Sequence, residues 1–442
     1  MKVTRVGYVA TLTLALVGSI ACSPPAEAAP GLNAPLMAAD PNWPKPLPNG
    51  WILGQVGGTC IDANDHVFVV TRGFQNGGLT APEGVGGANP NTGALGGSFK
   101  SRPAPPVVEF DPAGNVVNSW GDPSLVPAGT PPPVGTNSIV GQNAVVPNGM
   151  HGCYVDYLNN VWIGGNSDGA FQRYSHDGAF QLQIGQKFKC DDGNGGAIPC
   201  TGTGGGNIGN TGTNHPQGFQ GALLNLPAAL TVDPNPDPIT GQRGSVYIAD
   251  GYGNHRVAVF DYQGGFLRQF GSVGTGPDQF TSGDGGHPHC VRLGADQLIY
   301  ACDRGQNKIN VYTRSGQFVG NIMIVPGQLG TGNEGTGTAW DIDFSKDPNQ
   351  TFAFISDGQN EVLWTFDHAG SIQPPGGAAV NPTPLRGFGR PGHDPGTFTF
   401  LHMMAIDPKG NIYVGETVGG NRIQKLITKT VPGGGVTLVP GK

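Results

Sequence analysis

Short apolar segments recur along the chain, separated by turns rich in Gly, Asn, Asp and Arg. The repeating unit has an apolar segment ending near Asp, a polar turn, a further apolar segment and a Gly hairpin. The clearest copy runs from Val246 to Asp250, turns through Gly251–Arg256 and continues from Val257 to Phe260. Short apolar segments between such turns predict β-strands rather than helices.

Six copies of this unit are present. Their second strands start at Val67, Val161, Val246, Leu298, Phe352 and Ile412. One four-stranded sheet cannot bury both of its faces, whereas six sheets packed radially can. The sequence therefore predicts an all-β, six-bladed β-propeller. The last blade ends early, at Leu426, so we expect an N-terminal strand near Trp51-Ile52 to complete it.

Gly- and Pro-rich insertions make the spacing of the copies uneven, and we expect them to be surface loops or lids. They span about 76–106, 124–147 and 189–220. The predicted organisation is an export signal over 1–29, an N-terminal extension over 30–50, the propeller over 51–427 and a tail over 428–442.

Composition supports short strands and turns rather than surface helices. The chain has 76 Gly and 39 Pro in 442 residues, and only 12% of its residues are charged, about half the usual share. The net charge is −7 without a Lys/Arg cluster, which argues against a nucleic-acid partner.

The N-terminus has the pattern of an export signal, because Lys2 and Arg5 precede an apolar run. Two cleavage sites compete. Ala26-Glu27-Ala28 fits a signal peptidase, and Ser19-Ile20-Ala21-Cys22 resembles a lipoprotein box. We expect a periplasmic or extracellular protein, attached to a membrane only if Cys22 is lipidated.

Six further cysteines remain, an even number compatible with disulfides in an exported protein. Cys190–Cys200 would close a Gly-rich loop, and Cys290–Cys302 would link two neighbouring strands. These are two pairings among about 15 possible connectivities.

Three histidines share one position of the repeat. His151, His289 and His402 each lie eleven residues before the aromatic residue of a second strand, which is Trp162, Tyr300 or Tyr413. They belong to blades two, four and six. In the other blades we align Gly57, Ala228 and Thr338 with this position, although Ala228 and Thr338 lie further from their aromatic residues. Alternate blades of a six-fold ring are about 120° apart, so the three imidazoles should converge on the central channel. Three histidines with an open position are typical of a catalytic zinc site.

Charged and phenolic side chains follow the second strands. Arg72 and Arg304 occupy matching positions after these strands, and two guanidiniums suit a carboxylate. Tyr252 follows the third blade's second strand, where a phenol beside a metal would serve as a base. We expect the remaining seven histidines to be solvated: His66, His176, His215, His255, His287, His368 and His393.

These residues resemble the lyase domain of the peptidylglycine α-amidating enzymes, an NHL-type propeller family, over about 57–426. The resemblance rests on Val70-Thr71-Arg72-Gly73, His151-Gly152, Asp250-Gly251-Tyr252, Pro288-His289 with Asp303-Arg304, and His402 with Tyr413. It implies zinc on His151, His289 and His402, a substrate held by Arg72 and Arg304, and Tyr252 at the reacting hydroxyl. The implied reaction cleaves a peptidyl-α-hydroxyglycine to an amide and glyoxylate.

The chain departs from the family at Met403, which replaces an Asp that helps to bind calcium, so the resemblance does not extend to calcium. Phe400-Leu401 replaces Met-Pro, and Gly253 replaces a Cys. Two other functions stay open. One is a non-catalytic NHL propeller that serves as an extracytoplasmic binding or scaffold module. The other is a lactonase-type hydrolase, although such propellers hold their metal with carboxylates and Asn.

Overall fold

The computed structural model describes residues 32–73, 102–121, 146–187, 189–191, 197–199, 223–282, 285–324, 337–376 and 383–429. The chain divides into two units, Met1–Leu32 and Asn33–Lys442, and the fold below is that of the second unit. The predicted export signal and most of the C-terminal tail lie outside the described residues. No helix in the described ranges is long and apolar enough to cross a membrane.

Six four-stranded antiparallel sheets form the described unit. Blade one contains β3 (Val56–Ile61), β4 (Val67–Thr71), β6 (Val107–Phe110) and β7 (Val116–Trp120). Blade two contains β8 (Met150–Val155), β9 (Val161–Gly165), β10 (Ala170–Tyr174) and β11 (Phe180–Gly185). Blade three contains β14 (Ala229–Pro236), β15 (Arg243–Asp250), β16 (Arg256–Phe260) and β17 (Phe266–Phe270).

The remaining blades repeat this order. Blade four contains β18 (Val291–Leu293), β19 (Leu298–Asp303), β20 (Lys308–Thr313) and β21 (Phe318–Met323). Blade five contains β22 (Asp341–Phe344), β23 (Phe352–Asp357), β24 (Val362–Asp367) and β25 (Arg386–Phe388). Blade six contains β26 (Leu401–Ile406), β27 (Ile412–Glu416), β28 (Arg422–Lys429) and β1 (Leu36–Ala39).

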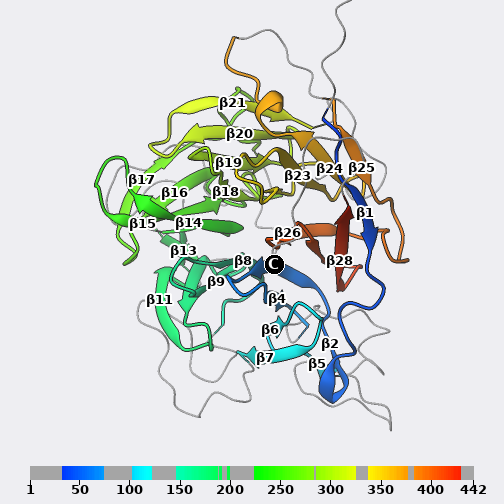
Figure 1. Cartoon of the computed structure of the whole chain (residues 1–442). Coiled ribbons are helices and arrows are strands. Elements are labelled where there is room, and N and C mark those ends of the chain that lie inside the picture. Colours follow the sequence, from blue (N-terminus) through cyan, green and yellow to red (C-terminus); the bar gives the residue numbers. More distant parts are fainter. Residues whose placement is uncertain are drawn as a thin grey trace, which may run out of the picture. The chain divides into compact units, whose positions relative to one another are not determined.

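The blades are arranged in a ring. The first strand of each blade contacts the first strand of the next, in the order β3, β8, β14, β18, β22, β26 and back to β3. The other strands follow outward, as the series β18, β19, β20 and β21 shows in Figure 1. The apolar core is correspondingly divided into six clusters, each formed mainly by two neighbouring blades. The predicted six-bladed propeller is confirmed, and all six predicted second strands are present.

The strand that closes the ring is not the predicted one. β1 pairs antiparallel with β28, with Ala39 opposite Leu426 and Leu36 opposite Lys429. The predicted strand at Trp51-Ile52, β2 (Trp51–Ile52), instead pairs with β5 (Arg102–Pro103). The long β28 offers an outer edge up to Lys429, and Trp43 anchors the N-terminal segment by packing on Phe110 and Tyr413. The closing strand therefore lies within the predicted extension.

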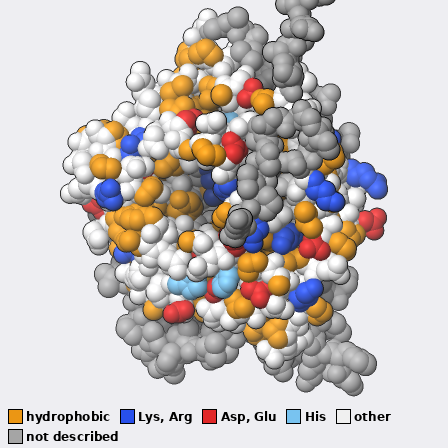
Figure 2. All heavy atoms as spheres, in the orientation of Figure 1, with side chains coloured by type: hydrophobic (Ala, Val, Ile, Leu, Met, Phe, Trp, Pro, Cys, Tyr) orange, Lys and Arg blue, Asp and Glu red, His pale blue; other side chains and the backbone are white. Residues whose placement is uncertain are grey.

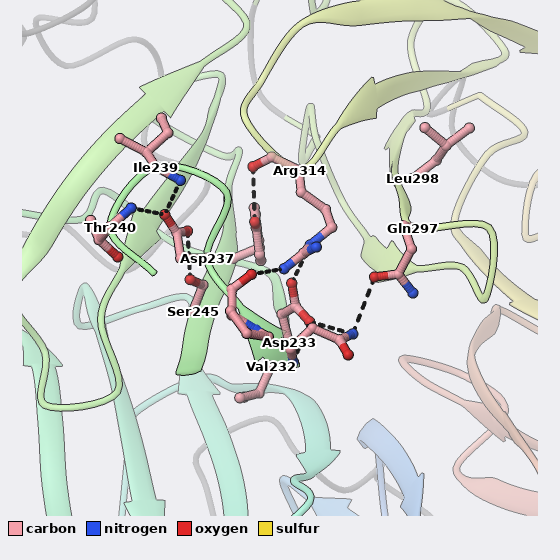
Figure 3. A network of polar contacts seen from close by, with 12 residues as sticks. Val232, Asp233, Asp237, Ile239, Thr240, Ser245, Gln297, Leu298 and Arg314 are labelled. Atoms are coloured by element: carbon pink, nitrogen blue, oxygen red, sulfur yellow. Dashed lines mark hydrogen bonds and ion pairs between the residues drawn. The ribbon is translucent and has the colours of Figure 1, made fainter. Parts of the chain in front are cut away.

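Polar contacts join the hairpin of one blade to the inner strand of the preceding blade. We call the aromatic residue in the middle of each second strand the aromatic anchor of its blade, and it pairs with a residue of the third strand. The residue three positions after that partner makes the contact in blades two to five. These contact residues are His176, Tyr262, Arg314 and His368. Figure 3 shows Arg314 of blade four bonded to Asp233 of blade three. Its neighbour Arg268 binds Asp237 at 2.7 Å and the Arg314 carbonyl at 2.7 Å. We call these contacts inter-blade latches.

Disulfides also connect the strands. Cys290–Cys302 forms as predicted, between the segment before β18 and strand β19. Cys60–Cys153 joins the inner strands of blades one and two and was not predicted. Cys190 is disulfide-bonded, and its predicted partner Cys200 lies outside the described residues. Most of the three predicted loops also lies outside the described residues, apart from 102–106, 146–147 and a hairpin of β12 (Lys189–Asp191) and β13 (Ala197–Pro199).

Candidate metal centre

Three imidazoles converge where alternate inner strands begin. His151 is the second residue of β8, His402 is the second residue of β26, and His289 lies two residues before β18. Their exposed fractions are 1%, 2% and 0%. Their ring centroids lie 4.7 to 5.1 Å apart. The structure thus brings together the three histidines singled out by their spacing.

Main-chain carbonyls of the following blades orient two of these rings. Nδ1 of His151 lies 2.7 Å from the Ala228 carbonyl oxygen, and Nδ1 of His289 lies 2.7 Å from that of Trp340. A carbonyl only accepts, so both Nδ1 atoms carry the proton and both Nε2 atoms present a lone pair. At His402 the backbone of Val56, at the start of the next inner strand, raises the pKa slightly against the effect of burial, but Nδ1 of His402 has no hydrogen-bond partner among the described residues. The contacts at His151 and His289 match the outer-shell contacts that fix metal-binding histidines.

The Nε2 atoms have the spacing of a metal site. Nε2 of His402 lies 3.2 Å from Nε2 of His151, and the ligand atoms of all three histidines lie within 4.8 Å of one another. Tetrahedral zinc with Zn–N bonds of about 2.0–2.1 Å separates its ligand atoms by about 3.3 Å. Nε2 of His289 is buried without a hydrogen-bond partner among the described residues. A buried acceptor of this kind, aimed at two other imidazoles, fits a bound cation.

Electrostatics keeps the three rings neutral. Burial lowers the pKa of His151, His289 and His402 well below the usual value, and the positive charge of Arg304 lowers each pKa further. Neutral imidazole is the form that ligates a metal. The environment therefore holds the rings in the ligand form at neutral pH.

A phenol and a guanidinium adjoin the histidines. The hydroxyl of Tyr252 lies 3.3 Å from Nε2 of His151, and its ring centroid is 6.0 Å from that of His289. Arg304, directly after β19, is 4% exposed, and its guanidinium carbon lies 4.2 Å from the Trp340 ring centroid. That ring fixes the plane of the guanidinium. Trp340 was not anticipated, because it precedes an inner strand and has no equivalent in the repeat.

Arg72 reaches the same place from blade one. It directly follows β4, and its Nε donates to the Met150 carbonyl oxygen at 2.7 Å. A Cβ on Gly57 would lie 2.1 Å from that carbonyl oxygen and 3.2 Å from Nε of Arg72, so only Gly admits the contact. Burial lowers the pKa of Arg72, although a guanidinium stays charged at neutral pH. Figure 2 shows Lys and Arg side chains near the middle of one face.

A glycine lets the segment before His289 pass close to the site. Gly286 has φ of 71°, and a Cβ there would lie 2.8 Å from the His289 ring and 3.0 Å from that of Tyr252. Any side chain at this position would be strained and would displace both rings. The backbone of 285–289 therefore forms one wall around the histidines.

Several other histidines are not solvated as predicted. His255, His287 and His368 are 1%, 4% and 4% exposed, because each is covered by a neighbouring blade that the local sequence does not reveal. His287 lies 3.3 Å from Asp303, next to Arg304. Burial alone would raise the pKa of Asp303, but His287 and Thr281 hold it below its usual value. His66 and His176 are partly buried, His393 is exposed as predicted, and His215 lies outside the described residues.

Comparison with known proteins bears on the fold alone. No protein-family model matches the chain, and no curated protein sequence matches it. A solved streptogramin B lyase is 12% identical over 86% of this chain and 94% of its own, with a TM-score of 0.41. A virginiamycin B lyase from Staphylococcus aureus is 12% identical over 89% and 98%, with a TM-score of 0.42. Hydrazine synthase from Kuenenia stuttgartiensis is 9% identical over 88% and 98%, with a TM-score of 0.42.

Proposed function

We propose that the protein is a zinc-dependent lyase that cleaves the C–N bond of an N-acyl- or peptidyl-α-hydroxyglycine. The products are an amide and glyoxylate. The observation that carries the proposal is the bare Nε2 of buried His289, which points at two further neutral imidazoles with two guanidiniums nearby. The resemblance to the amidating lyases supplies the reaction class, and the disulfides are compatible with an exported protein.

His151, His289 and His402 would hold the zinc through Nε2, leaving one position open toward the substrate. Zinc in this position would polarise the substrate hydroxyl and stabilise negative charge on its oxygen. The main-chain carbonyls behind His151 and His289 would keep both rings in register as the metal binds.

Tyr252 is placed to move the proton. Its hydroxyl lies 3.3 Å from Nε2 of His151, within reach of a group bound at the open position. It would accept the proton of the substrate hydroxyl while the C–N bond breaks and the electron pair moves to nitrogen. The nitrogen would then take up a proton to give the amide, and the former hydroxyl carbon becomes the aldehyde of glyoxylate. No proton or electron is gained or lost overall.

Arg304 and Arg72 would bind the substrate carboxylate. Arg304 has its plane fixed by Trp340, which favours a bidentate contact with a carboxylate. Arg72 donates from Nε to the Met150 carbonyl oxygen at 2.7 Å and from Nη1 to Oε1 of Gln55 at 3.4 Å, so Nη2 is the nitrogen that would donate to a ligand. Two guanidiniums beside three neutral histidines favour an anionic substrate over a neutral one.

Glyoxylate release from an N-acyl-α-hydroxyglycine tests the proposal. We expect turnover by the zinc-loaded protein, loss after chelation, recovery with zinc, and no turnover by His289→Ala. The same compound without its carboxylate should be a poor substrate. Turnover that survives chelation, or zinc-loaded protein inactive on all carboxylated α-hydroxyamides, would refute the lyase assignment. The second result would favour the non-catalytic binding module.

A further inference from the structure

We infer that the protein carries a second divalent-metal site, of the zinc class, at the junction of blades one and two. The ligands would be Asp62, Glu109 and His176, with His66 bonded to Glu109. Their candidate ligand atoms lie within 4.8 Å of one another. Asp62 follows β3 and His176 lies in the turn after β10, whereas the three channel histidines stand where inner strands begin. The inference is independent of the proposed lyase activity.

Repeat positions show that blade one differs from its neighbours here. Asp156 and Asp407 occupy the position of Asp62 in blades two and six, and each uses Oδ1 to accept two main-chain N–H groups of its turn. Asp62 does the same with Asn64 and His66. This part of the arrangement is common to the fold and indicates no ligand.

The second carboxylate oxygen is where the blades diverge. Oδ2 of Asp156 accepts from Trp162 at 2.8 Å and Tyr262 at 2.6 Å. The anchor of blade one is Phe68, which has no donor, so Oδ2 of Asp62 is left facing Nε2 of His176 at 3.1 Å. The residue four positions after the Asp is Asn160 in blade two but His66 in blade one.

Glu109 adds a second carboxylate that the repeat does not require. It pairs with Phe68, and the matching positions in blades three and four are Val259 and Val311. Oε1 of Glu109 lies 2.6 Å from Nδ1 of His66 and 3.6 Å from Nε2 of His176. Blade one thus has Asp, Glu and His where zinc ligands would be needed.

Charge compensation points to a cation. The side chains of Asp62 and Glu109 are 0% and 3% exposed. Among the described residues, neither forms an ion pair with Lys or Arg, and both contact only histidines at their free oxygens. Two buried carboxylates this close repel each other unless positive charge lies between them. A divalent ion supplies both charges.

Geometry and access fit such an ion. The distances of 3.1 and 3.6 Å from Nε2 of His176 to the two carboxylates bracket the separation of about 3.3 Å expected between tetrahedral zinc ligands. The side chains of His176 and His66 are 25% and 29% exposed, so an ion can enter from solvent. The ion would join the same two blades as the Cys60–Cys153 disulfide.

The decisive experiment counts zinc in protein whose channel site has been removed. His289→Ala protein, offered zinc and dialysed, should retain about one zinc per chain. His176→Tyr in that background should lose this zinc, because the variant has no imidazole to bind it. Tyrosine is the matched replacement, since Tyr262 occupies the same latch position in blade three and contacts the carboxylate of Asp156. Glu109→Val should also lose it, and His66→Asn should weaken zinc binding about 10- to 100-fold.

Two controls keep the result interpretable. His393→Ala, at an exposed histidine, should leave zinc content unchanged. Cobalt(II) added to the His289→Ala protein should give visible d–d absorption. This readout reports metal binding while Asp62, Glu109 and His176 are all unsubstituted. Absence of both zinc and cobalt absorption in His289→Ala, or zinc retained by His176→Tyr in that background, would overturn the inference. One wild-type zinc that survives His289→Ala but not His176→Tyr would support it and refute the channel site.

Discussion

Nε2 of His151 lies 3.2 Å from Nε2 of His402, although 251 positions separate the two residues in the chain. They come from blades two and six, on either side of blade one. Nδ1 of His151 is fixed by a carbonyl of blade three. The distance between the two Nε2 atoms is therefore set by how the inner strands pack around the ring, so the site depends on the whole propeller.

Removal of one channel histidine should abolish metal binding in the channel. His402→Ala leaves two imidazoles, too few for a tight zinc site. Zinc bound in the channel should fall below one ion per chain. Elemental analysis of His402→Ala beside His176→Tyr, which removes the second site, distinguishes the zinc of the two sites. A His402→Ala protein with undiminished zinc while His176→Tyr loses one ion would show that the channel binds none.

Tyr252→Phe should separate catalysis from metal binding. Loss of the hydroxyl removes the group that accepts the proton, so kcat should fall by about 10²- to 10⁴-fold. Zinc content should be unchanged, because the phenol contacts His151 without replacing it as a ligand. Glyoxylate release and elemental analysis on the same preparation check both statements. Near-wild-type kcat would exclude Tyr252 as the base.

Arg304→Lys should weaken substrate binding more than its retained charge suggests. Lysine cannot present a planar, bidentate donor pair against Trp340. We expect kcat/KM to fall by about 10- to 100-fold, mainly through KM. A matched change, Arg314→Lys at the latch to Asp233 of blade three, should leave kcat/KM unchanged. Equal effects of the two substitutions on kcat/KM would argue against a carboxylate contact at Arg304.

The stability of the metal-free protein should depend on pH through the buried triad. Burial depresses the pKa values of the three histidines below the ordinary histidine value of about 6.5. Below about pH 6.5 the unfolded chain binds protons that the folded state excludes, so stability present above this pH is lost as the pH falls. The Tm should therefore drop from pH 7 to pH 5, and His289→Gln should reduce the drop. An equal pH slope in the variant, measured by calorimetry, would contradict the depressed pKa.

Removing the Cys60–Cys153 disulfide should destabilise the protein by about 2–4 kcal/mol. The bond joins residues 93 positions apart and crosses from blade one to blade two, whereas Cys290–Cys302 spans only 12 positions. The Ser/Ser variant of the first pair should therefore unfold at lower denaturant than that of the second. Denaturation monitored by tryptophan fluorescence compares the two, and the reverse order would show that local packing outweighs loop length.

The repeat in the sequence predicted most of the propeller because each blade encodes its own strands. The spacing of eleven residues before Trp162, Tyr300 and Tyr413 also identified the channel histidines, since a fixed position in the repeat becomes a fixed position in space. Arg304 and Tyr252 were found in the same way, as residues that follow second strands.

Features that depend on contacts between blades escaped prediction. Leu36–Ala39 is a short apolar segment whose role depends on the exposed edge of β28, a partner at the other end of the fold. His255 is buried against the segment around His287, which contributes the carbonyl it contacts at 3.1 Å. The Cys60–Cys153 bond required knowing that two inner strands lie side by side. Local sequence carries no signal for such pairings.

The pairing of β1 with β28 has a consequence for the order of events during synthesis. Residues 36–39 emerge before every other strand of the ring, yet their partner at 422–429 emerges after all the others. Until then the first strand has no edge to join and the sixth sheet has an open one. Two copies growing close together could exchange these strands and form a swapped dimer. The β1–β28 pairing that closes the ring is thus also the place where two chains can exchange strands.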